Sequence, residues 1–144
     1  MTSNVHIFDY GKRLMAERIA GDTLKSINGM YLEYSDTPLV DLEYRDVAYF
    51  SQLKKRPHSG YGRVAVKDIH VIGDGSIQIT GIFSCSDLKG GRLCKDSRLE
   101  VVTLAYMQDD IEAKDGFIAS VKLTTPMKLI KGAAMSVTIT LNLE

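Results

Sequence analysis

Few residues in this chain have the types and spacing that catalysis or metal binding requires. The histidines His6, His58 and His70 show no i, i+4 pairing, and no cysteine stands at metal-ligand spacing, which argues against a zinc site. The sequence has no G-x-S-x-G elbow and no catalytic cysteine signature, so acyl transfer is disfavoured. Because the sequence shows no recognisable acid–base pair or nucleophile, we expect a protein that is not an enzyme and that uses no cofactor.

Two other stretches invite a ligand interpretation. The acidic run Asp109–Asp115 could supply oxygen ligands to calcium, but it departs from the D-x-[DN]-x-[DN]-G register and includes Lys114, so we favour a solvated turn. Gly60 and Gly62 before Arg63 faintly suggest a phosphate cradle, yet no strand–GxxxxGK[ST]–helix order surrounds them. The sequence therefore predicts neither a metal site nor a phosphate site.

One concentrated basic patch interleaves with Tyr61 in a polar loop, and it consists of Lys54, Lys55, Arg56, His58 and Arg63. Such a patch could contact nucleic acid or an acidic protein surface through ion pairs and ring stacking. The simpler interpretation, an exposed loop kept soluble by charge, is favoured. The 18 basic and 18 acidic residues of the whole chain cancel, so a nucleic-acid partner is not expected.

Length and composition indicate one domain over residues 1–144. Hydrophobic residues make up 44% and charged residues 25%, as in ordinary globular proteins. No apolar run is long enough for a membrane span and no signal peptide is readable, so we expect no membrane partner and synthesis in a cytoplasm. For Cys85 and Cys94 we favour free thiols, although their spacing allows a bridge across a hairpin.

The N-terminal third contains residues that typically start and end a helix. A short amphipathic helix is predicted at about residues 9–21, with Asp9 as its cap, Gly21 as its stop and Leu14, Met15 and Ile19 on one face. The dipeptide Asn28-Gly29 indicates a turn before a strand over residues 30–34. Residues 41–53 fit either a helical stripe or an extended segment, which allows a second short helix.

After a predicted loop over residues 54–63, the pattern becomes all-β, with a β core at about residues 64–143. Strands are predicted over 64–72, 76–84, 98–108 and 117–124, and Gly73-Asp74-Gly75 favours a tight hairpin between the first two. The final strand, Met135–Leu143, alternates apolar and polar residues, and we expect it to be an inner strand. These elements predict a mainly β fold, an antiparallel β-sandwich or small barrel of about six strands with one or two short helices.

Three segments together resemble a known family. The run AYFSQL surrounds Tyr49, the arginine-led strand YGRVAV follows from Tyr61 to Val66, and the chain closes with SVTITLNLE. This pattern resembles small structural proteins of tailed bacteriophages, which carry a YY-x-x-L segment, a Y-x-R-V-x-L strand and a closing strand of the LTVTWTITF kind. The family's closing strand commonly has a tryptophan, whereas this chain has none and places Ile139 and Leu141 at the apolar positions.

The resemblance implies a bacteriophage virion protein that is assembled in the host cytoplasm. We expect a capsid decoration or cement protein, a homo-oligomer that stabilises the head by contacts with the major capsid protein. A neck, tail or baseplate ring or adaptor component is the alternative, and a carbohydrate- or ligand-binding β module is a third. Tyr31, Tyr34, Tyr44, Tyr49 and Tyr61 are interpreted as surface tyrosines. The expected partner-binding residues are Lys54, Lys55, Arg56, Arg63 and Tyr61, together with Val5, Ile7, Phe8 and Tyr10 of the N-terminal segment.

Overall fold

Most of the described residues form β-strands, whose apolar residues alternate with polar ones and which often end near a glycine. The computed structural model describes residues 5–35, 59–88, 97–107 and 116–142, with the backbone alone for residues 35 and 59–61. The elements in chain order are β1 (Val5–Ile7), α1 (Asp9–Ala20), β2 (Gly29–Ser35), β3 (Ser59–Ile72), β4 (Ser76–Phe83), the 3-10 turn η1 (Cys85–Asp87), β5 (Arg98–Tyr106), β6 (Gly116–Lys128) and β7 (Met135–Asn142).

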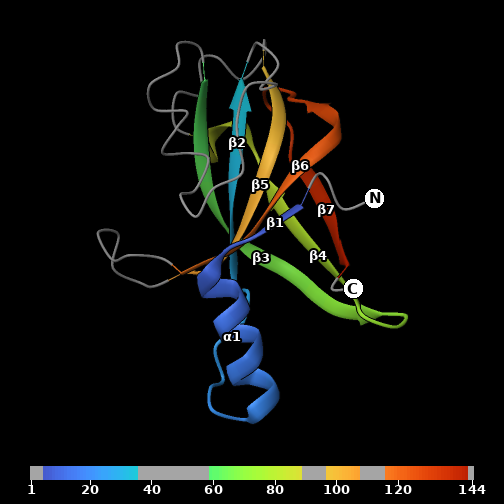
Figure 1. The fold of residues 1–144 in the computed structure, drawn as a ribbon. Helices are drawn as coiled ribbons and strands as arrows, with labels where there is room; N and C mark the ends of the chain where they lie inside the picture. Colours follow the sequence, from blue (N-terminus) through green and yellow to red (C-terminus); the bar gives the residue numbers. More distant parts are fainter. Residues whose placement is uncertain (1–4, 36–58, 89–96, 108–115, 143–144) are drawn as a thin grey trace.

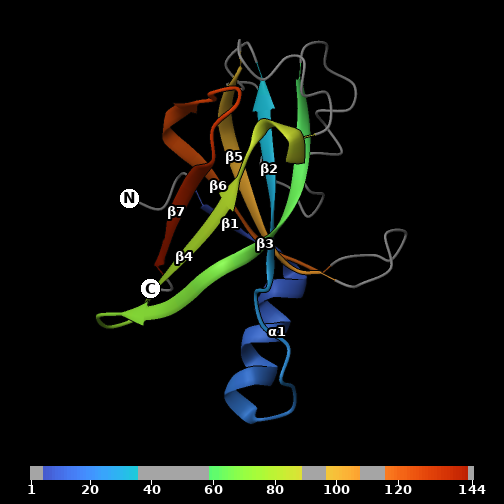
Figure 2. The same ribbon diagram turned by 180° about the vertical axis from the view of Figure 1, so that it is seen from behind.

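The seven described strands form one sheet in the order β1-β6-β5-β2-β3-β4-β7, and every neighbouring pair is antiparallel. The sheet curls into a half-barrel, with α1 projecting from one end (Figures 1 and 2). The mainly β prediction is therefore confirmed, and each of the six predicted strands has its counterpart. Strand β1 was not predicted, because three residues are too few to show an alternating pattern.

Strand β2 lies at the centre of the sheet. Met30, Leu32 and Tyr34 alternate along it, and each side chain is fully buried in the core inside the curl. Their cross-strand neighbours in β5 are Leu104, Val102 and Leu99, which belong to the same core. Burial of each such side chain stabilises the fold by roughly 1.5–3 kcal/mol relative to its exposure.

Helix α1 covers residues 9–20, as predicted, and ends at Gly21, which adopts a left-handed φ of 80°. The expected cap is wrong: Phe8 occupies the N-cap position in an extended conformation, and Asp9 is the first helical residue. The expected apolar face is also only partly right. Leu14 is buried, whereas Ile19 is 89% exposed because the second half of the helix extends beyond the sheet (Figure 1).

The β3–β4 hairpin is confirmed, with Ile72 opposite Ser76 across a three-residue turn in which Gly73 and Gly75 have φ of 59° and 86°. The loop predicted over residues 54–63 is wrong from residue 59 onward, because β3 begins at Ser59. Gly62 is there for packing and not for a turn. A Cβ on it would overlap Leu88, with which Gly62 forms an isolated β-bridge.

Strand β7 pairs with β4 through eight consecutive residue pairs without a bulge, and its residues alternate between buried and exposed as predicted. The expectation of an inner strand is wrong, because β7 lies at one end of the described sheet order. Alternation reports which face of a strand is buried, and it does not report how many neighbours the strand has.

Cys85 is disulfide-bonded in this structure, which overturns the preference for free thiols. It lies buried at the start of η1, directly after β4. Cys94, the other cysteine of the sequence, lies outside the described residues.

The approach of α1 to β6 generates a first prediction. The backbone N–H of Phe8 donates to the carbonyl of Ile118 at 3.0 Å, and a Cβ on Gly11 would overlap that same carbonyl. Gly11→Ala should therefore destabilise the fold by about 1–3 kcal/mol, because backbone must move to admit one methyl group. Urea unfolding followed by circular dichroism measures the change. Lys12→Ala, at the exposed neighbouring position, is the control, and equal midpoints for both variants would contradict the packing described here.

Candidate partner-binding surface

The predicted basic patch is only partly described. Lys54, Lys55, Arg56 and His58 lie outside the described residues. Arg63 is half-buried in β3, opposite Tyr31 of β2, and its Nε donates to Sδ of Met107 at 3.1 Å. Tyr61 pairs with Glu33 through the same two strands. The structure thus places Arg63 within the sheet, where its side chain packs against its own chain.

The predicted N-terminal contact residues pack largely against their own chain. Val5 and Ile7 pair with Val121 and Ala119 of β6 and pack on the core, and Phe8 is buried. Tyr10 is half-buried, with the Arg13 guanidinium 5.4 Å from its ring centre. In this conformation the segment stabilises the fold, and a role in partner binding stays a prediction.

The tyrosines expected on the surface are distributed differently. Tyr34 is fully buried in the core, and Tyr31 is 7% exposed, with its ring 5.4 Å from that of Phe117. The expectation of surface positions is wrong for these two, because β2 is covered on both faces. Tyr44 and Tyr49 lie outside the described residues, as does the side chain of Tyr61.

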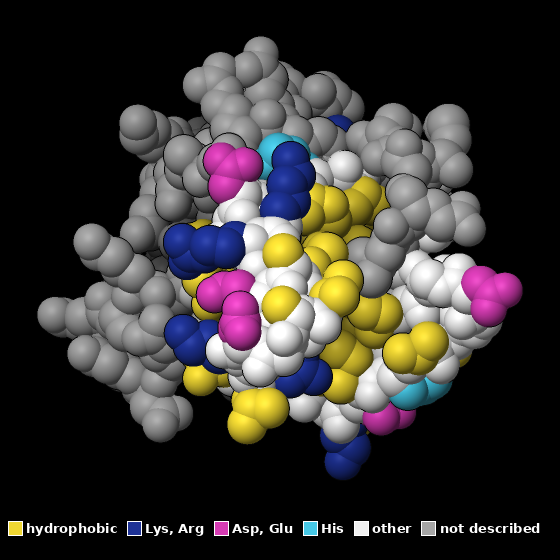
Figure 3. Space-filling model, turned by 60° about the horizontal axis from the view of Figure 1, so that its bottom comes forward, with side chains coloured by type: hydrophobic (Ala, Val, Ile, Leu, Met, Phe, Trp, Pro, Cys, Tyr) yellow, Lys and Arg dark blue, Asp and Glu magenta, His cyan; other side chains and the backbone are white. Residues whose placement is uncertain are grey.

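Exposed apolar side chains gather instead at the end of the molecule that α1 and the β3–β4 hairpin share. Ile19 and Leu24 are 89% and 91% exposed, and Ile69 and Val71 are 39% and 72% exposed. Figure 3 views this end, and hydrophobic side chains line the space between the helix and the hairpin. We call these four residues the end surface. Isolated exposed apolar residues are common, but four at one end form a candidate contact site.

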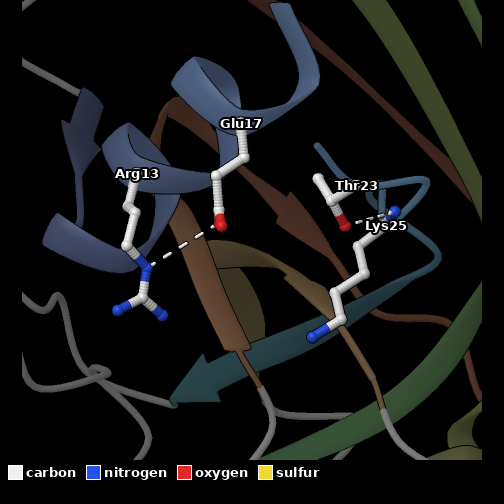
Figure 4. A network of polar contacts seen from close by, with 4 residues as sticks. All are labelled: Arg13, Glu17, Thr23 and Lys25. Atoms are coloured by element: carbon white, nitrogen blue, oxygen red, sulfur yellow. Dashed lines mark hydrogen bonds and ion pairs between the residues drawn. The ribbon is translucent and has the colours of Figure 1, made fainter. Parts of the chain in front are cut away.

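One half of the end surface, Ile19 and Leu24, lies on an arm formed by α1 and residues 21–26. The helix closes with a Schellman arrangement, in which the N–H groups of Gly21 and Asp22 donate to the carbonyls of Arg18 and Glu17 at 3.1 and 2.8 Å. Figure 4 shows Arg13 paired with Glu17 at 3.8 Å, and the N–H of Lys25 donating to Oγ1 of Thr23 at 3.2 Å. The Schellman hydrogen bonds end the helix between the exposed side chains of Ile19 and Leu24.

The other half is a shelf formed by Ile69 and Val71 of β3. Residues directly opposite each other in an antiparallel pair share a face, so Ile69 lies on the side of Ile79 and Val71 on the side of Ile77. Ile79 is buried in the core, and the next strand continues the two rows with Ile139 and Leu141. The shelf therefore belongs to the core-facing side of the sheet. It lies where the described residues of the chain no longer cover that side.

A polar row crosses the opposite face of the sheet. The hydroxyl of Thr103 donates to Oε1 of Glu33 at 3.3 Å, and the hydroxyl of Ser120 lies 2.8 Å from that of Thr103 and donates to it. His6 pairs with Ser120 through the β1–β6 ladder. Glu33, Thr103 and Ser120 are all fully buried, so no substrate can reach them in this conformation. The row ties three strands together by hydrogen bonds in a water-free environment.

Glu100 marks an irregularity near the other end of the sheet. It stands at a register shift between Leu99 and Val101 and is 4% exposed. Burial raises the pKa of its carboxyl group, and attraction to Lys122 and Arg98 partly opposes that rise. Burial likewise raises the pKa of the Tyr34 hydroxyl.

A second prediction concerns the charge on Glu100. Because its pKa is raised in the folded protein, the native state holds this proton to a higher pH than the unfolded chain, and stability falls as pH rises through that interval. Glu100→Gln should therefore stabilise the fold at neutral pH by on the order of 1 kcal/mol, with little gain in acid. Thermal melts across pH measure the difference. Asp74→Asn in the exposed hairpin turn is the control, and a gain from Glu100→Gln that does not depend on pH would contradict the assignment.

The described ranges also bear on other classes of site. No cluster of three or more histidine, cysteine or acidic side chains that could hold a metal ion occurs within them. In the same ranges no helix is long and apolar enough to span a membrane.

The chain was also compared with known proteins. No protein-family profile, no curated protein sequence and no solved structure matches it.

Sequence reasoning missed the end surface. Ile19 was assigned to the buried face because its spacing from Leu14 and Met15 fits a helical stripe, and nothing local shows where the sheet stops. Leu24 and Val71 did carry a signal, because each lies within three residues of a glycine that ends an element, and such ends lie at the surface.

Proposed function

We propose that this chain is a structural protein of a tailed-bacteriophage particle, and more specifically a capsid decoration protein. The observation that carries the proposal is the end surface, on which Ile19, Leu24, Ile69 and Val71 are exposed together. An exposed apolar surface beside a well-packed core is typical of a subunit that completes its burial in an assembly.

The resemblance to phage structural proteins supports the same conclusion. Of its three motifs, YGRVAV lies in β3 and SVTITLN lies in β7, so two of the segments that carry the resemblance are neighbours of β4 in one sheet. The shelf residues Ile69 and Val71 belong to β3, and Ile139 and Leu141 of β7 lie in the same two rows across β4. The third motif, around Tyr49, lies outside the described residues.

A decoration protein acts by linkage. Binding to the assembled lattice, and not to free capsid subunits, stabilises the shell by an amount that grows with occupancy. The side chains that would contribute are apolar ones that lose water on contact, and each gains roughly 1.5–3 kcal/mol when fully buried. A protein of this kind needs a hydrogen-bonded core and an exposed apolar surface, and the curled sheet and the end surface supply these.

The third prediction tests this role on particles of a tailed phage that encodes the chain. Purified particles should contain it, and particles that lack it should release their DNA at a temperature several degrees lower. Adding the purified protein back should restore the difference, whereas Leu24→Glu protein should restore less of it. Ile82→Glu protein is the control, because that residue is also large, apolar and exposed but lies outside the end surface.

The copy number separates the locations in the particle. Hundreds of copies would support decoration of the head, while about six to eighteen would support a neck, tail or baseplate ring. Complete absence from purified particles would overturn the virion proposal. Equal DNA-release temperatures with and without the protein would overturn the stabilising role.

A further inference from the structure

We propose that the outer edge of β7 binds the same edge of a second copy of this chain, so that the two β7 strands pair antiparallel about a two-fold axis. The contact consists of main-chain hydrogen bonds between the two strands, flanked by their side chains. This inference goes beyond the proposed function, because it involves none of the four residues of the end surface. The purified chain alone is enough to test it.

The first step is the position of β7 at a margin of the sheet. Within the described residues the sheet ends with β7 on one side and with β1 on the other, and β7 has β4 as its one neighbouring strand (Figure 2). The main-chain N–H and C=O groups on the outer side of an edge strand are available to pair with a strand of another chain. The edge of β7 is therefore a possible contact site that depends on backbone geometry and not on an apolar patch.

The second step is that β7 lacks the features that usually keep edge strands apart. Proteins protect such strands by making them very short or by adding charged side chains, proline or a bulge. Strand β1, at the opposite margin, has three residues. Strand β7 has eight residues, its ladder with β4 contains no bulge, and its sequence contains neither proline nor a charged residue. The sheet is thus protected at β1 and open to pairing at β7.

Length and charge select a second β7 as the partner. The β1 edge of another copy matches only three of the eight residues, whereas a second β7 matches nearly the whole strand. Close to a two-fold axis each residue lies near its own counterpart, so a charged residue there would meet the same charge. The uncharged sequence from Met135 to Asn142 removes that repulsion.

The alternation of β7 fits the same symmetry. Because residues directly opposite each other share a face, a two-fold axis through Thr138 places Met135 opposite the second copy's Leu141. An axis through Ile139 likewise keeps apolar residues opposite apolar ones. The exposed hydroxyl side chains then extend a row in which Thr80 and Thr138 already lie 3.1 Å apart. Each copy has one such edge, so the assembly closes at two copies.

The test is sedimentation equilibrium of the purified full chain over a wide concentration range. We expect a monomer–dimer equilibrium, with Thr138→Lys weakening dimerisation at least tenfold, because it places like charges beside the axis. Thr80→Lys is the matched control. Thr80 lies directly opposite Thr138 in the inner strand β4, so both variants remove the same hydroxyl contact and only one of them alters the edge. Thr80→Lys should dimerise as the unmodified chain does, and circular dichroism checks that both variants are folded.

A mixture of oppositely charged variants gives a sharper result. Thr138→Glu alone should weaken dimerisation as Thr138→Lys does, but the mixture of the two should dimerise more tightly than either variant alone, because unlike charges then meet beside the axis. A mixture of Thr80→Lys with Thr80→Glu should show no such gain. A mixture of the Thr138 variants that dimerises no better than its components would overturn the pairing of the two edges.

Hydrogen exchange measured by mass spectrometry locates the contact without any substitution. The amides of β7 should exchange several-fold more slowly at concentrations where the chain is dimeric than where it is monomeric, because new hydrogen bonds form along the edge. Dimers whose β7 amides keep the exchange rate of the monomer would overturn the proposal. A chain that stays monomeric at all concentrations would do the same, and open-ended growth would overturn the two-fold closure.

The two proposals fail in different ways. A monomeric chain that nevertheless raises the DNA-release temperature of particles overturns the pairing of β7 edges and leaves the virion role standing. A dimer that forms through β7 but is absent from particles overturns the virion role and leaves the dimer standing.

Discussion

The fold depends on burial of the central strand β2 on both of its faces. Met30, Leu32 and Tyr34 point into the curl and are fully buried, while Glu33 on the other face is equally inaccessible. Its backbone pairs with β3 on one side and β5 on the other, so β2 joins the half of the sheet that carries α1 to the half that carries the hairpin. If β2 moved, both the arm and the shelf would lose their position.

The elements that could be predicted from sequence are those set by local chemistry. The β3–β4 turn follows from two glycines with positive φ, and the alternation of β7 follows from the two faces of a strand. What could not be predicted depends on distant partners. The edge position of β7, the packing role of Gly62 and the burial of Glu33 are all set by residues far away in sequence.

The candidate site was less predictable than the fold for the same reason. Exposure of Ile19 is decided by the point at which the sheet ends beneath α1, and no spacing within the helix records it. Val5 and Ile7, which are expected from the sequence to contact a partner, pair with β6 and pack on the core of their own chain, and no spacing within that short segment records these neighbours. The surface that an apolar side chain leaves open to a partner depends on how much of it the rest of the fold covers.

The order of the strands in the sheet also shapes how the chain is made. Strand β2 leaves the ribosome early, yet its partner β5 follows only after β3 and β4, and β1 must wait for β6. Loops of that length close slowly, and until they close the apolar face of β2 has an incomplete cover. During synthesis the half-built sheet is therefore more exposed to wrong pairings than the sheet of the finished protein is.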